Sequence, residues 1–289
     1  MTGAAAVSPE PSVRIDRVEI TTACETGATH RQRHRDCDDA VGWSGADGGS
    51  VVATVAIADG HSDQRCVRSR AGAAFVVAAA TAMPGDTLGP HAITEALIAD
   101  WRRRVDRHLA DNPLTAADLE ATDGGGAAES SPAWAPNARV AYGTTAVLCR
   151  ITHNAITIVR VGDGDVIAVS TDGRACRLAV PESRPSDITE SISQPDAPRV
   201  ARFAEIPADA APVLLMLATD GFDNAYPADD SMLRAASELV ALRRDSERPI
   251  GSDVLSQWAR EAADTSGDDA TVAAIWIGTT PGVGPARAG

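Results

Sequence analysis

Apolar residues along this chain gather in short runs, and the clearest is residues 51–58, Val-Val-Ala-Thr-Val-Ala-Ile-Ala. Apolar and polar positions do not alternate there, so the run predicts a strand buried on both faces. Residues 213–219 form a second run of this kind. Residues 13–22 do alternate, with one slip near Arg17, which predicts a strand with an exposed face and a bulge.

Helical spacing is found in four stretches. Residues 67–83 are almost wholly apolar up to Pro84, which predicts a buried helix. Residues 90–109 carry an apolar stripe opposite an arginine-rich side, which predicts an amphipathic helix with a solvated face. The same spacing returns after Ser231 and after Ser252, both plausible helix caps.

The middle of the chain is typical of closely spaced strands, which we place at residues 145–151, 155–161, 166–171 and 175–179. The turns His153-Asn154 and Asp172-Gly173 fit hairpins, so we expect an antiparallel meander. Further strands are expected at residues 200–206 and 271–277. Paired helices and antiparallel strands, without regular βαβ alternation, indicate an α+β fold in which helices cover a sandwich of sheets.

One core is expected, in a domain spanning residues 13–278. The small and polar residues 1–12 and 279–289 predict disordered tails, and residues 111–137 predict a mobile loop. Residues 181–198 are polar and irregular. Because loops around a rigid site usually carry substrate specificity, we expect residues 111–137 and 181–198 to determine it.

Composition narrows the class of protein. Apolar residues make up 44% of the chain and aromatic residues 3%, so the core must consist mainly of small aliphatic side chains. A net charge of -14 disfavours binding to nucleic acid or to anionic membranes. The 26 basic residues are all arginine, which indicates a GC-rich bacterial genome. Five cysteines without CxxC spacing, no signal peptide and no membrane-length apolar run predict a cytoplasmic protein with no membrane insertion.

Acidic residues stand next to the ends of four apolar strands. Asp38-Asp39 and Asp268-Asp269 precede a strand, and Asp59 and Asp220 follow one. Asp-Gly, found twice among them, is commonly no more than a turn dipeptide. Its recurrence at strand ends far apart in sequence instead favours one cluster of carboxylates at the end of a sheet. Magnesium and manganese ions prefer such oxygen ligands, so we predict a binuclear metal centre there.

A basic segment, residues 29–36, lies just before the first acidic pair. It contains Arg33 and Arg35 among other arginine and histidine residues. The segment fits a solvated loop. It fits equally an anion clamp, because guanidinium groups offer paired donors to phosphate oxygens.

The order of six motifs resembles that of the metal-dependent serine/threonine phosphatases of the protein phosphatase 2C family. Each motif is weakly specific alone, but together they span roughly residues 13–277. The motifs are Cys37-Asp38-Asp39-Ala40, Ala58-Asp59-Gly60-His61, Gly143-Thr144-Thr145, Val161-Gly162-Asp163-Gly164, Ala218-Thr219-Asp220-Gly221 and Asp268-Asp269-Ala270-Thr271.

This resemblance implies a four-layer αββα sandwich of two antiparallel sheets flanked by pairs of helices. It also implies two Mn²⁺ or Mg²⁺ ions, with room for a third. Asp59 would bridge the ions and the Gly60 carbonyl would be a further ligand. Asp220 and Asp268 would complete one ion's shell, and Asp38 or Asp39 would serve the other ion, directly or through water.

The resemblance further implies in-line attack on phosphorus by a hydroxide held between the two ions. His61 stands where some family members carry a histidine that protonates the leaving oxygen; the alternative is a partly exposed turn histidine. Arg33 and Arg35 are rivals for the family's phosphate-binding arginine. The other histidines are expected on the surface or in the core.

This sequence departs from the family pattern at Asp38, where Glu or Gln is usual, at Asp269, where Asn is common, and in the register of the arginine. The aspartates at strand ends remain, so we expect an active enzyme. We also expect a monomer. Its expected substrates are proteins phosphorylated on serine or threonine by a bacterial kinase. One alternative is a weak or inactive relative that binds phosphorylated partners, and another is a metal phosphohydrolase acting on small phosphoesters.

Overall fold

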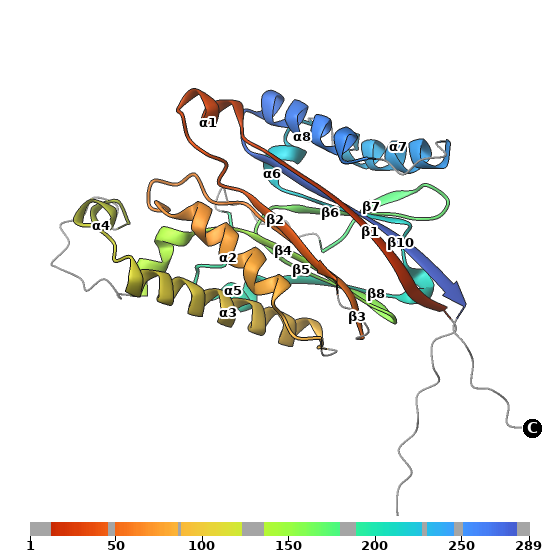
Figure 1. Ribbon diagram of the computed structural model, residues 1–289, viewed down its shortest axis with the longest axis horizontal. Coiled ribbons are helices and arrows are strands. Elements are labelled where there is room, and N and C mark those ends of the chain that lie inside the picture. The colour runs from red at the N-terminus through yellow and green to blue at the C-terminus, as the bar shows by residue number, and fades with distance from the viewer. Residues whose placement is uncertain are drawn as a thin grey trace, which may run out of the picture.

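A computed structural model describes residues 13–45, 50–85, 88–122, 136–179, 189–226, 230–245 and 251–281 of the chain. Within these ranges, two antiparallel sheets of five strands each are stacked, and paired helices cover their outer faces (Figure 1). The fold is α+β, and the four-layer sandwich expected from the sequence is confirmed.

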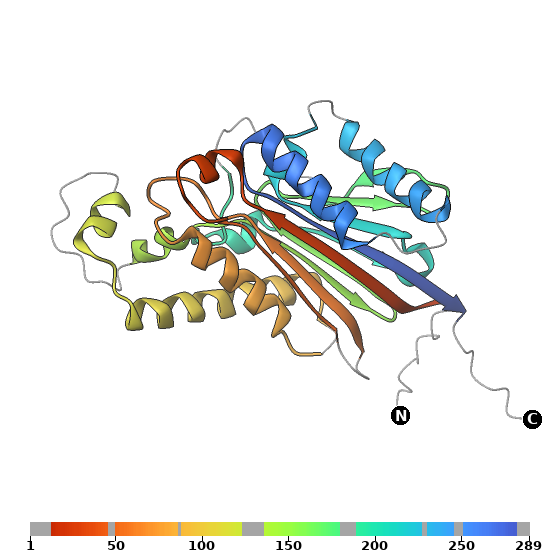
Figure 2. The same cartoon turned by 45° about the horizontal axis from the view of Figure 1, so that its top comes forward.

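The first sheet joins the two ends of the described chain. Its strands, in spatial order, are β1 (Val13–Glu25), β10 (Ala270–Pro281), β9 (Leu214–Ala218), β6 (Asp165–Val169) and β7 (Ala175–Arg177). β1 and β10 run side by side along their whole length in both views (Figures 1 and 2). Their register shifts between Ile15 and Arg17, which confirms the predicted bulge. β10 extends into residues 279–281, which we expected in the C-terminal tail.

The second sheet consists of β2 (Ala40–Gly45), β3 (Val51–Ala58), β4 (Ala146–Thr152), β5 (Ala155–Val161) and β8 (Arg202–Pro207), in that spatial order. β3 matches its predicted bounds and is buried on both faces, as predicted. The hairpins β4–β5 and β6–β7 are confirmed as well.

The predicted meander is wrong, because β5 and β6 lie in different sheets. The chain crosses between the sheets at Gly162, whose φ of +100° is open to glycine but strained for other residues. A Cβ atom on Gly162 would also lie 2.6 Å from Thr145. β5 and β6 are both buried on both faces, so their hydrophobic pattern does not reveal which sheet each one joins.

Four long helices form the outer layers. α2 (Ser69–Thr81) lies on β2 and β3, and α3 (Pro90–Asp111) packs against α2. On the other side, α8 (Ser252–Ser266) covers β1 and β10, while α7 (Ser231–Asp245) covers β6 and β7. All four correspond to predicted helices. None of the described helices combines the length and the apolar character needed to cross a bilayer.

The short helices were not predicted. α1 (Ala28–Gln32) lies in the basic segment, α4 (Ala116–Thr122) in the expected loop 111–137, and α5 (Ala197–Val200) at the end of segment 181–198. α6 (Asp220–Asp223) follows β9, and two 3₁₀ turns are η1 (Pro136–Tyr142) and η2 (Ala208–Ala210). Such helices span about one or two turns, too few for a periodic signal. Residues 1–12 and 282–289 lie outside the described residues.

Small aliphatic side chains fill the space between the sheets, as the composition predicts. Buried members from the two sheets include Val55, Ile57, Val147, Ile158, Val166, Leu215, Leu217 and Ile275. This layer holds the sheets together, so it also fixes how the strand ends of one sheet meet those of the other.

Leu215→Ala tests this layer. Leu215 is fully buried between the sheets, so its truncation should lower the free energy of unfolding by about 2–5 kcal/mol. Leu242→Ala on α7, at a side chain 52% exposed, should change it by less than about 0.5 kcal/mol. Urea unfolding of both variants provides the measurement, and equal losses would contradict this account of the core.

Candidate active site

Strand pairing brings the acidic residues to one edge of the sandwich. In the second sheet, Ala40 at the start of β2 pairs with Ala58 at the end of β3. Asp39 and Asp59 are the next residues beyond this pair, so they lie at the same end of the two neighbouring strands. In the first sheet, β9 and β10 are paired in the same manner. Gly221 allows their ends to touch, because a Cβ atom there would lie 2.0 Å from the Asp269 carbonyl oxygen.

The acids of the two sheets meet directly. The Thr219 hydroxyl donates to Asp39 Oδ2 at 2.9 Å, across 180 positions of sequence. The carboxyl groups of Asp59 and Asp220 also lie close enough for each to shift the pKa of the other. The structure thus brings together Asp39, Asp59 and Asp220, and the charge of exposed Asp268 acts on the last two.

Burial and like charge make this cluster hard to ionise. Burial raises the pKa of Asp59 well above its ordinary value, and the charges of Asp39 and Asp220 raise it further. Burial also raises the pKa of Asp39 and of Asp220. Without a cation, burial and mutual repulsion therefore oppose the ionisation of these carboxyl groups.

Threonine hydroxyls hold the backbone around Asp59. Thr144 Oγ1 donates to the Asp59 carbonyl oxygen at 2.7 Å. Thr145 Oγ1 accepts from the Asp59 backbone N–H at 3.0 Å. Gly60 forms an isolated bridge with Thr144 and is buried, and a Cβ atom at Gly60 would lie 2.6 Å from the Asp38 carbonyl oxygen. The motif Gly143-Thr144-Thr145 therefore acts as a clamp on the backbone beside the acids.

The donor set fits hard divalent cations. Asp39 Oδ1 and Asp220 Oδ1 are buried and have no hydrogen-bond partner in the structure. Buried carboxylate oxygens without donors are what an ion such as Mn²⁺ or Mg²⁺ requires. Within the described residues, however, no three His, Cys, Asp or Glu side chains already stand in the arrangement of a metal site.

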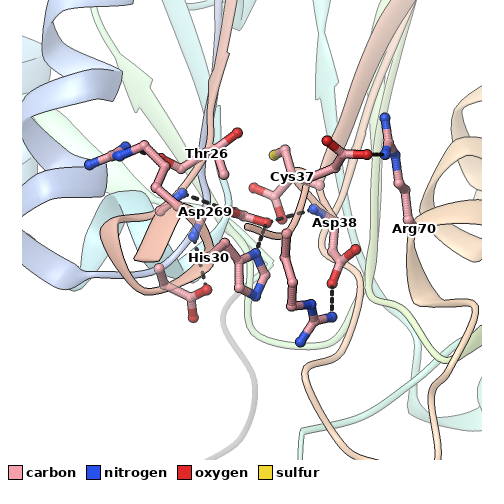
Figure 3. Close-up of polar contacts among 12 residues, drawn as sticks. Thr26, His30, Cys37, Asp38, Arg70 and Asp269 are labelled. Atoms are coloured by element: carbon pink, nitrogen blue, oxygen red, sulfur yellow. Dashed lines mark hydrogen bonds and ion pairs between the residues drawn. The ribbon is translucent and has the colours of Figure 1, made fainter. Parts of the chain in front are cut away.

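Asp38 and Asp39 have different surroundings in the structure, although the sequence leaves either of them as the possible metal ligand. The Asp38 carboxylate pairs with Arg35 at 2.7 Å and not with the Asp39 cluster (Figure 3). Its backbone N–H donates to Asp269 Oδ2 at 2.6 Å. Burial raises the pKa of Asp38, while Arg35 lowers it. Asp39 is thus better placed than Asp38 to reach a cation beside Asp59.

Asp269 anchors the loop that carries these acids (Figure 3). It is buried, and its oxygens accept from the Gly27 N–H at 2.7 Å and lie 2.9 Å from His30 Nδ1. Together with the Asp38 N–H, these groups occupy both oxygens of Asp269. An asparagine there would have a single acceptor oxygen, which explains why a carboxylate suits this position.

His61 follows the acids on the way to α2. Burial lowers its pKa, while the charges of Asp163 and Asp63 oppose that effect. Its Nε2 is buried without a hydrogen-bond partner. One ring nitrogen of His61 is therefore not engaged by the protein. Of the other histidines, His30 and His108 bond to Asp269 and Tyr142, His153 bonds to the Ile15 carbonyl oxygen, and His91 packs on Phe203.

The two candidate phosphate-binding arginines differ in their partners. Arg33 ends α1, is exposed, and makes no side-chain hydrogen bond or ion pair with the described residues. Arg35 is already paired with Asp38. Both lie on the segment that leads into Asp38-Asp39, so the structure keeps them beside the acids without choosing between them.

Sequence analysis missed the roles of Asp163 and of the threonines. The charge of Asp163 acts on both Asp220 and His61, and its Oδ2 accepts from Thr189 at 2.7 Å. Asp163 belongs to the motif Val161-Gly162-Asp163-Gly164, so its place in that motif was the available signal. Nothing in the spacing of Thr144, Thr145 and Thr219 indicates that their hydroxyls point at backbone and carboxylate groups near the site.

Solved structures share this fold. The serine/threonine phosphatase Stp1 from Staphylococcus aureus has 15% identity and a TM-score of 0.58, with 91% of this chain and 96% of that chain covered. PppA, described as a key regulatory component of T6SS in Pseudomonas aeruginosa, has 15% identity and a TM-score of 0.55, with 92% and 100% covered. The catalytic domain of the phosphatase PstP, solved with two manganese ions, has 16% identity and a TM-score of 0.54, with 92% and 99% covered.

The sequence itself matches the model of one family over most of its length. A comparison with curated proteins found no significant match. Residues 26–260, however, match the model described as protein phosphatase 2C. That range contains all the candidate site residues except Asp268 and Asp269. The chain belongs to the protein phosphatase 2C family.

Proposed function

We propose that this protein is a metal-dependent phosphatase that hydrolyses phosphoserine and phosphothreonine in proteins. The observation that carries the proposal is the convergence of Asp39, Asp59 and Asp220 from two sheets, with buried carboxylate oxygens that lack donors. An acid cluster of this kind is costly to bury unless a cation is bound. Family membership supports the same function.

The proposed ligands are the aspartates at the strand ends. Asp59 would contact both of two ions, with the Gly60 carbonyl oxygen beside it. Asp220 and Asp268 would complete one shell, and Asp39 would serve the other ion in preference to Asp38, whose carboxylate is paired with Arg35. The two manganese ions of the PstP structure support the number and the kind of ion.

Bound Mn²⁺ or Mg²⁺ would activate a water molecule for in-line attack on phosphorus and neutralise charge on the phosphate oxygens. The chain's own residues do the rest. Thr144, Thr145 and Thr219 hold Asp59 and Asp39 in fixed positions. His61 is the proposed donor of a proton to the leaving serine or threonine oxygen, because its Nε2 is otherwise unpaired.

Arg33 is the better candidate for holding the substrate phosphate. Its guanidinium group is exposed, whereas Arg35 would first have to leave Asp38. A free guanidinium group can give two parallel hydrogen bonds to phosphate oxygens.

The proposed location is the cytoplasm. The five cysteines are free thiols, which suits a reducing compartment. We propose that the enzyme acts there as a monomer and that its substrates are the products of a serine/threonine kinase.

Asp59→Asn tests the proposal as a whole. The wild type should release phosphate from a phosphothreonine peptide with Mn²⁺ or Mg²⁺ and not with EDTA. Asp59→Asn removes the charge shared by both proposed ions, so turnover should fall by more than about 100-fold, beyond what loss of an outer partner costs. Asp172→Asn, in the exposed turn between β6 and β7, is the matched control and should retain full activity.

Two other results would redirect the proposal. A folded wild type that binds Mn²⁺ and phosphopeptide without turnover would support the regulatory alternative. Much faster turnover of nucleotides or sugar phosphates than of peptides would support a small-phosphoester hydrolase.

Thr219→Val tests the positioning of Asp39. Valine has nearly the shape of threonine but cannot donate to Asp39 Oδ2, so Mn²⁺ affinity should fall by about 10- to 100-fold. Isothermal titration calorimetry measures it. Thr265→Val on α8, where the hydroxyl bonds only its own helix, should leave the affinity unchanged. An unaltered affinity in Thr219→Val would show that Asp39 needs no such support.

His61→Gln tests proton donation. Hydrolysis of a phosphothreonine peptide requires a proton on the leaving oxygen, so kcat for the peptide should fall by about 100-fold. p-Nitrophenyl phosphate expels a stable phenolate without protonation, so its kcat should stay close to that of the wild type. Equal losses on both substrates would instead assign His61 a role in binding or structure.

A further inference from the structure

The thiol groups of Cys24 and Cys37 are in contact. Their sulfur atoms lie 3.4 Å apart and share a hydrogen bond. Cys24 lies near the end of β1, where it pairs in register with Thr271 of β10. Cys37 immediately precedes Asp38. A disulfide has a sulfur–sulfur distance of about 2.05 Å, so rotation of the two side chains has little more than an ångström to close.

The other three cysteines lack this arrangement. No further contact between two sulfur atoms occurs among the five cysteines, all of which the structure describes. Cys66 and Cys149 are buried, and burial raises the pKa of their thiols to about 11 and about 12. Cys176 is exposed on β7. Cys24 and Cys37 are therefore the one pair of thiols in contact near the surface. They lie at the two ends of the segment that leads from β1 into Asp38-Asp39.

We propose that Cys24 and Cys37 form a redox-active dithiol, which hydrogen peroxide oxidises to a disulfide that closes residues 24–37 into a covalent loop. The observations that carry the proposal are the contact of the two sulfur atoms and their position on either side of the basic segment. Formation of this disulfide does not depend on the proposed phosphatase activity.

Exposure assigns the first step to Cys24, because Cys24 is exposed and Cys37 is half-buried. Its thiolate sulfur attacks one peroxide oxygen, the O–O bond breaks, and the departing hydroxide takes up the thiol proton as water. The Cys37 sulfur then attacks the Cys24 sulfur, the S–O bond breaks, and the second hydroxide leaves as water with the Cys37 proton. Two thiols lose two electrons in all, and the peroxide is reduced to two water molecules.

The closed loop would contain α1, Arg33 and Arg35, and it would end one residue before Asp38. Reduced, this segment is held by the contacts of His30 and of the Gly27 N–H with Asp269. Oxidised, it would also be tied to β1 by a covalent bond. The disulfide would therefore limit the movement of the proposed phosphate-binding arginines, a consequence that rests on the proposed function.

Mass spectrometry of the full chain treated with hydrogen peroxide tests the proposal. The wild type should lose the mass of two hydrogen atoms and two titratable thiols, and dithiothreitol should restore both. Cys24→Ser and Cys37→Ser should each abolish the mass loss. Cys176→Ser removes an exposed but unpaired thiol and should oxidise as the wild type does.

Several outcomes would overturn the proposal. They are retention of all five thiols, addition of oxygen to one cysteine without mass loss, and disulfides that link two chains. Persistence of the mass loss in Cys24→Ser or Cys37→Ser would also do so, because another pair would then be reacting.

A second measurement follows the loop itself. Trypsin should cleave after Arg33 and Arg35 at least about threefold more slowly in the oxidised wild type, because closing the loop suppresses the local opening that cleavage requires. Peroxide-treated Cys24→Ser should be cleaved at the rate of the reduced protein. An unchanged rate in the oxidised wild type would show that the disulfide does not constrain the segment.

Kinetics then link the disulfide to the site. Oxidation of the wild type should change KM for a phosphothreonine peptide reversibly, and peroxide-treated Cys24→Ser should keep the reduced value. If the protein proves inactive, the mass and cleavage measurements still decide the fate of the dithiol, so the two proposals fail separately.

Discussion

The site depends on one constraint, the burial of several carboxyl groups where the strand ends of the two sheets meet. Mutual repulsion and loss of water oppose that burial. The protein counters it at Asp39 with the hydroxyl of Thr219, which donates to the Asp39 carboxylate. This contact exists only when the sheets are stacked, so the packing of the aliphatic layer and the geometry of the acids depend on each other.

Adjacent acids divide the work in two places. The two members of each pair have different partners: Asp39 accepts from Thr219, while Asp38 pairs with Arg35. In the same way, Asp268 is exposed beside the cluster, and Asp269 is buried and holds Gly27, His30 and the Asp38 backbone. One member of each pair thus serves as an anchor for the segment that presents the other.

Strand ends and their order could be read from the sequence, and with them most of the site. Asp59 and Asp220 end long apolar runs, so their places at strand ends follow from local pattern, whereas their convergence depends on the stacking of the two sheets. The distinction between Asp38 and Asp39 depends on one side-chain direction in an irregular loop, which no periodicity records. The passage of the chain between sheets at Gly162, and the helix α4, likewise depend on tertiary contacts that a hydrophobic pattern does not encode.

The pairing of β1 with β10 has a consequence for synthesis. Residues 13–25 lie against residues 270–281, almost the whole described length away, so the first sheet cannot close until its last strand has left the ribosome. Contacts between such distant segments are slow to form, because loop closure costs entropy before they are gained. Asp268 stands two residues before that last strand, and the acid cluster is therefore completed only after this distant segment has been synthesised.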